Sequence, residues 1–144
     1  TMTATLTEQL TQQTDNLAAL KAMLDKELHL ISSRDAEALM TLLKDKEQLL
    51  GTIQNLDEAI NPQLQALQQE APLPEDIQAH IDQAKNLLSE CQYCTEVNQL
   101  AVEQGQLRLV HLRNLMMDVR AKESLTYDKA GKKKGGFSGK GVSA

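Results

Sequence analysis

Two cysteines three residues apart, Cys91 and Cys94, form the one motif in this chain that is typical of a redox or metal site. A redox-active C-x-x-C pair starts a helix after a strand, and no strand is predicted here. A structural zinc site needs four Cys or His ligands, whereas His29, His80 and His111 show no ligand spacing. We therefore expect Cys91 to pack in a helical seam beside Cys94, with no metal and no cofactor.

The sequence also contains no motif that is typical of nucleophilic catalysis or phosphate binding. The sequence contains no Gly-x-Ser-x-Gly, no phosphate-binding glycine loop, and no histidine beside a candidate nucleophile. Its carboxylates recur along charged helical stretches, where a solvated helix face is the ordinary interpretation. We therefore do not expect an enzyme.

The composition indicates long helices. Of 144 residues 24 are leucine, and the aromatic residues are limited to Tyr93, Tyr127 and Phe137. So few aromatics disfavour a nucleic-acid binder that stacks bases, and no apolar stretch approaches the ~20 residues of a membrane span. Because the N-terminal segment also lacks a basic stretch followed by an apolar run, we expect no secretory signal and a cytoplasmic location.

Heptad spacing of apolar residues predicts three helices. The first covers about 5–32, and its seam includes Leu6, Leu10, Leu17, Leu20, Leu24, Leu28 and Ile31. The second helix begins after a break at 32–35, with Ser33 as its expected N-cap. The seam of this helix includes Leu39, Leu42, Leu49, Ile53, Leu56, Ile60 and Leu67. At Asn61-Pro62 we expect a kink, or a new start capped by Asn61.

The third helix follows Ala71-Pro72-Leu73-Pro74 and is expected to end near Lys122. Its seam positions alternate at spacings of four and three residues: Ile77, Ile81, Ala84, Leu88, Cys91, Thr95, Asn98, Val102, Gly105, Leu109, Leu112, Met116 and Val119. Short connections make consecutive helices antiparallel neighbours. The predicted fold is therefore all-α, an elongated antiparallel three-helix coiled-coil bundle with a flexible C-terminal tail.

The charge distribution divides the chain into a body and a tail. Residues 1–120 hold 9 Lys and Arg against 18 Asp and Glu, a net of −9, while residues 121–144 hold 6 against 2, a net of +4. We expect a helical coiled-coil body over residues 1–122 and a flexible, basic, Gly-rich tail over residues 123–144.

Polar residues within the seams have structural interpretations. Glu27 and Lys46 occupy core-type positions that an antiparallel hairpin brings within about one turn, so they either form a partly buried ion pair that fixes the register or extend outward to solvent. Asn98 at a seam position specifies pairing at some cost in stability. Gly105 permits a close helix approach or leaves a groove for a partner.

A wide apolar face lies near the end of the third helix, at Leu109, Leu112, Leu115, Met116 and Val119. It either packs on the end of the bundle or binds a helix of another protein. Because the third helix is predicted to be longer than the other two, we favour partner binding.

This pattern resembles the FlgN family of flagellar type III export chaperones. One matching stretch contains Glu27, Leu30, Asp35, Leu39, Leu42, Lys46, Leu49 and Leu50, like the family's E-L-D-L-L-K-LL frame. A second contains Cys94, Asn98, Gly105 and Leu107, like its C-N-G-L run, and the segment from Leu125 to Gly131 resembles the family's C-terminal end.

The resemblance implies a cytoplasmic chaperone that binds the hook–filament junction proteins FlgK and FlgL and delivers them to the flagellar export gate. It implies client binding through the face from Leu109 to Val119, and gate docking through Tyr127, which could instead pack back on the bundle. No catalysis, cofactor, nucleic acid or stable membrane insertion is implied, and weak self-association is allowed. The basic end from Lys132 onward departs from the family pattern.

Two other functions fit parts of the sequence. A structural coiled-coil protein that only oligomerises would form a stable homodimer with no free apolar face. A nucleic-acid or anionic-lipid binder would act through the lysines of residues 132–140, which beside an acidic body make a weak electrostatic footprint.

Overall fold

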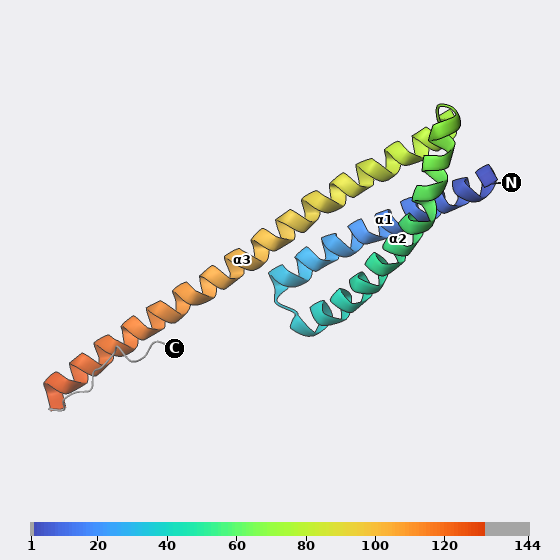
Figure 1. The fold of residues 1–144 in the computed structure, drawn as a ribbon. Coiled ribbons are helices and arrows are strands. Elements are labelled where there is room, and N and C mark those ends of the chain that lie inside the picture. Colours follow the sequence, from blue (N-terminus) through green and yellow to red (C-terminus); the bar gives the residue numbers. More distant parts are fainter. Residues whose placement is uncertain (1, 132–144) are drawn as a thin grey trace. The chain divides into compact units, whose positions relative to one another are not determined.

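The computed structural model describes residues 2–131, with side chains over residues 5–123. It contains three helices, α1 (Met2–Ser33), α2 (Ala36–Glu70) and α3 (Glu75–Gly131), and no strand in that part of the chain (Figure 1). The prediction of an all-α, three-helix fold is confirmed. By its internal contacts the chain divides into residues 1–101 and residues 102–144, and each part is described separately below.

Arg34 and Asp35 form the turn between α1 and α2. Arg34 has a φ of 59°, a left-handed conformation that commonly ends a helix. The Asp35 carboxylate then accepts a hydrogen bond from the backbone N–H of Ala38 at 3.1 Å and caps α2. The predicted N-cap, Ser33, is wrong, because Ser33 is the last residue of α1 and its hydroxyl donates back to the carbonyl of Leu30.

Hydrogen bonds between helices define their directions within residues 2–101. Gln13 donates a hydrogen bond to Asp57, and Lys46 donates one to Glu27. The later residue of α1 therefore pairs with the earlier residue of α2, so α2 runs antiparallel to α1. The bonds from Cys91 and Asn98 to α1 both join residues 74 apart in sequence, so this segment of α3 runs parallel to α1. These directions agree with the predicted order of antiparallel neighbours.

The apolar core of this part includes two clusters of buried residues. One contains the buried residues Leu6, Leu10, Ile60 and Ile77, and the other contains Leu20, Leu24 and Cys91. Fully burying one such aliphatic side chain contributes about 1.5–3 kcal/mol. Both clusters include residues of α1 and α3, so α1 packs against α3 at two levels.

Within residues 75–101 the seam of α3 differs from its prediction at two positions. Leu88 is 44% exposed and Thr95 is exposed, whereas Leu87 and Cys94 are partly buried. In a heptad pattern the residue on either side of a seam position can also face a neighbouring helix. The Cys94 thiol lies 3.7 Å from the Asp25 carboxylate of α1, so packing against α1 partly buries Cys94 rather than Thr95. Thr95 satisfies its hydroxyl within α3 by donating to the Cys91 carbonyl at 2.9 Å.

Two helix boundaries also differ from the predictions. The helix α2 continues through Pro62, so a new helix starting at Asn61 is wrong; Figure 1 shows α2 bending in its later part. The predicted end of α3 at Lys122 is also wrong, because α3 continues to Gly131. Residues 123–130 contain no Gly or Pro that would interrupt the helix before Gly131. Residues 132–144 of the predicted tail lie outside the described residues.

Candidate partner-binding face

The candidate site is an apolar face on α3 within residues 102–123. We call it the α3 apolar face, and it consists of Leu109, Leu112, Leu115, Met116 and Val119. Between 47% and 57% of each of these residues is exposed. Within residues 102–123 no described side chain covers this face, and both interpretations, packing on the end of the bundle and binding a partner helix, stay predictions.

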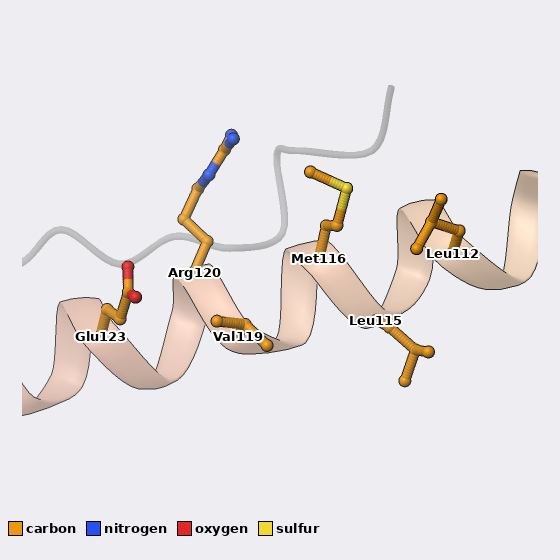
Figure 2. A pocket seen from close by; sticks show the side chains of 6 residues that line it. All are labelled: Leu112, Leu115, Met116, Val119, Arg120 and Glu123. Atoms are coloured by element: carbon orange, nitrogen blue, oxygen red, sulfur yellow. The ribbon is translucent and has the colours of Figure 1, made fainter.

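Helical spacing explains how the face is built. Leu112, Met116 and Val119 are separated by four and three residues, which places them on one side of α3. With Leu115, Arg120 and Glu123 they line an open pocket (Figure 2). In Figure 2 Met116 and Arg120 point to the same side of the helix, while Leu115 points to the other. The arrangement offers flexible apolar contact and one cation, and Met suits such an adaptable surface.

Gly105 precedes this face on α3. A Cβ atom built at Gly105 would meet no described atom within 4 Å. Both explanations for its seam position, a close helix approach and a groove for a partner, stay predictions.

A polar network joins the three helices in the first part of the chain. The Lys46 ammonium donates to both carboxylate oxygens of Glu27, at 2.9 and 3.1 Å. The Asn98 amide donates to Glu27 Oε2 at 3.1 Å and to the carbonyl of Leu24 at 2.9 Å. Only 10% of the Glu27 side chain and 22% of the Lys46 side chain are exposed, so the ion pair expected from the sequence is present and partly buried.

The two cysteines are packing residues in this structure. Both are free thiols, and Cys91 is buried and donates a weak hydrogen bond to the carbonyl of Leu17 at 3.5 Å. Burial raises the pKa of Cys91, and burial together with the nearby Asp25 carboxylate raises the pKa of Cys94. Raised pKa values leave little reactive thiolate at neutral pH. Among the described side chains no group of three or more His, Cys, Asp and Glu could hold a metal ion.

Sequence reasoning missed a buried amide on α1. Gln13 is 4% exposed, and its Nε2 donates to the carbonyl of Ile53 at 2.9 Å and to the Asp57 carboxylate at 2.6 Å. The signal was available, because Gln13 lies three residues after Leu10 and four before Leu17, at a seam position. Tyr127, the predicted docking residue, lies within α3, and its side chain is outside the described residues.

Comparison with known proteins decides the family. The sequence model of the FlgN protein family matches residues 2–135, nearly the whole chain. The chain belongs to the FlgN family. This is a family of flagellar export chaperones rather than of enzymes. Comparisons with curated proteins and with solved structures gave no match. None of the helices in residues 2–131 is long and apolar enough to cross a membrane.

Proposed function

We propose that this FlgN family member is a cytoplasmic chaperone that binds the hook–filament junction proteins FlgK and FlgL before export. It holds an amphipathic terminal helix of the client on the α3 apolar face and delivers the client to the flagellar type III export gate. The observation that carries the proposal is the half-exposure of the five large apolar side chains that make up the α3 apolar face. Monomeric proteins rarely leave such contiguous apolar surface without a binding role.

The size of the face suits reversible binding. About half of each side chain is already covered, so a partner helix gains on the order of 1 kcal/mol from each of the five. That gross gain of about 5 kcal/mol must offset the loss of rotational and translational freedom on association. The face alone therefore gives modest affinity, which allows the client to be released.

Delivery to the gate is assigned to Tyr127. Tyrosine offers a large contact area with few rotatable bonds, which suits a docking residue. Tyr127 follows the α3 apolar face by about two turns of the same helix, so client and gate would be bound by adjacent segments.

Co-expression of the chain with FlgK and with FlgL, followed by pull-down and size-exclusion chromatography with light scattering, tests this proposal. We expect a complex with each client, and weaker complexes for Leu112→Ala/Met116→Ala. The matched control is Met40→Ala/Leu50→Ala, which removes the same two residue types from exposed positions on α2. The control should keep wild-type binding.

The same chromatography tests the alternative function. A coiled-coil protein that only oligomerises would elute as a stable homodimer and would form no complex with either client. Absence of both complexes, or equal loss of binding in the control and in Leu112→Ala/Met116→Ala, would contradict the proposed function.

A further inference from the structure

The charged residues at the flanking heptad positions of the α3 apolar face are all basic. In heptad terms Gly105, Leu109, Leu112, Met116, Val119 and Glu123 are seam positions. The flanking positions are the residues after Gly105, Leu112 and Val119 and the residues before Leu109, Met116 and Glu123. The flanking positions hold Gln106, Arg108, Arg113, Leu115, Arg120 and Lys122. Every charged residue among them is basic.

The acidic residues of this segment do not occupy the flanking positions. Glu103 is two residues from Gly105, so a rotation of about 100° per residue turns it away from the face, whereas Asp118 lies about 60° from Leu115, at the edge of the face. Glu123 occupies the seam position after Val119 and lines the C-terminal end of the pocket. The basic border is local, because residues 1–101 hold 6 Lys and Arg against 16 Asp and Glu, a net of −10.

These flanking cations are accessible. Arg108 and Arg120 are both exposed, and neither forms an ion pair with any other residue of the described chain. In coiled coils the flanking positions set partner choice through charge pairing across the seam. Arginines held beside an apolar face therefore favour a partner helix with carboxylates at its own flanking positions.

The same pattern disfavours a second copy of this chain. When two copies of α3 pair in parallel, the flanking residues that precede seam positions in one copy meet those that follow seam positions in the other. When they pair antiparallel, preceding residues meet preceding residues and following residues meet following residues. Because both flanks are basic here, either orientation of two α3 apolar faces would place cation beside cation. Like-charge contacts of this kind act against the wrong partner.

We infer that the α3 apolar face selects an amphipathic helix whose apolar seam is bordered by Asp and Glu, with Arg108 and Arg120 as specificity-determining residues. The inference rests on the proposed function and adds to it the chemical class of the client segment.

Two synthetic peptides of about three heptads test it with the full-length chain. They share one leucine seam and carry either Glu or Lys at the flanking positions. Fluorescence anisotropy should show that the Glu peptide binds about tenfold more tightly than the Lys peptide at low salt, and that added salt reduces the difference. Equal affinities, or binding of neither peptide, would overturn the inference.

A charge-reversal variant makes the test specific to these arginines. Arg108→Glu/Arg120→Glu should weaken Glu-peptide binding by about tenfold and strengthen Lys-peptide binding. The control Lys26→Glu/Lys44→Glu changes the net charge equally at exposed positions on α1 and α2 and should keep the wild-type preference. An unchanged preference in the arginine variant, or the same change in the control, would overturn the inference.

The outcomes separate this inference from the proposed function. If Leu112→Ala/Met116→Ala loses FlgK while the arginine variant keeps the wild-type peptide preference, the proposed function stands and the charge selection is wrong. If Leu112→Ala/Met116→Ala binds FlgK normally, the proposed function itself is wrong. A wild-type dimer that Arg108→Glu/Arg120→Glu dissociates would identify a second copy as the occupant and overturn the inference.

Discussion

Replacing Lys46 by methionine should destabilise the helical bundle substantially, because Glu27 would remain buried without its cation. Lys46 supplies two of the three hydrogen bonds to the Glu27 carboxylate, at 2.9 and 3.1 Å, and Asn98 supplies the third. Methionine keeps the length of the lysine stem and removes only the charge. The variant therefore measures the cost of the unpaired carboxylate rather than a loss of packing.

The magnitude follows from distance and burial. Two unit charges about 3 Å apart attract by roughly 1.4 kcal/mol in water and roughly 6 kcal/mol at an effective dielectric constant of 20. Removing one partner of a fully buried pair costs about 3–5 kcal/mol. Since 22% of the Lys46 side chain and 10% of the Glu27 side chain remain exposed, we expect Lys46→Met to lower the unfolding free energy by about 2–3 kcal/mol.

A double-mutant cycle separates the pair from its surroundings. Glu27→Met/Lys46→Met should recover most of the loss, because a buried ion pair replaced by apolar residues of similar volume is often nearly neutral. Asn98 keeps its bond to the Leu24 carbonyl in that variant and loses one hydrogen bond, which costs about 1 kcal/mol. Urea unfolding followed by circular dichroism at 222 nm gives each free energy.

An exposed ion pair on α1, the helix that carries Glu27, provides the control. Lys21 and Asp25 are 3.4 Å apart with 37% and 60% of their side chains exposed, so Lys21→Met should change stability much less than Lys46→Met. If the coupling energy between Glu27 and Lys46 is below about 0.5 kcal/mol, the two side chains behave as a solvated surface pair and the reasoning is wrong.

Four further predictions concern the α3 apolar face, the cysteines and the C-terminal end. Leu112→Ala/Met116→Ala should weaken client binding and leave the melting temperature unchanged, because the two residues are 53% and 57% exposed; a large drop in melting temperature with intact client affinity would mean that they are ordinary core. At neutral pH iodoacetamide should react with Cys91 and Cys94 more slowly than with a free cysteine, and faster as the pH rises, because both pKa values are raised. Cys91→Ser/Cys94→Ser should keep client binding; stoichiometric zinc in the wild-type protein, lost in this variant, would contradict the packing role. Tyr127→Ala should keep melting temperature and client affinity but reduce binding to the export gate, measured with purified gate protein; unchanged gate binding, or easier unfolding, would rule out the docking role.

The sequence alone predicted the three helices and placed Glu27 and Lys46 within about one turn of each other, and it left open whether the two side chains pair or extend to solvent. Leucines at heptad spacing define one apolar side of each helix, and breaks such as Ala71-Pro72-Leu73-Pro74 separate the helices because Pro and turn residues interrupt helical hydrogen bonding. An antiparallel hairpin of known turn position fixes which residues face each other. The sequence therefore indicated that the two residues are close together, and the structure shows that they form an ion pair.

Only the tertiary structure decided which side of each seam is buried. Cys94 is partly buried and Thr95 is exposed because this segment of α3 packs against α1, and a sequence pattern does not state which neighbour a helix will meet. The Gln13 amide is buried because Asp57 and the Ile53 carbonyl both accept its hydrogen bonds, and those partners lie on α2, at least 40 residues away in sequence. Local spacing marks candidate positions, whereas burial depends on contacts between distant segments, which exist only once the helices have packed.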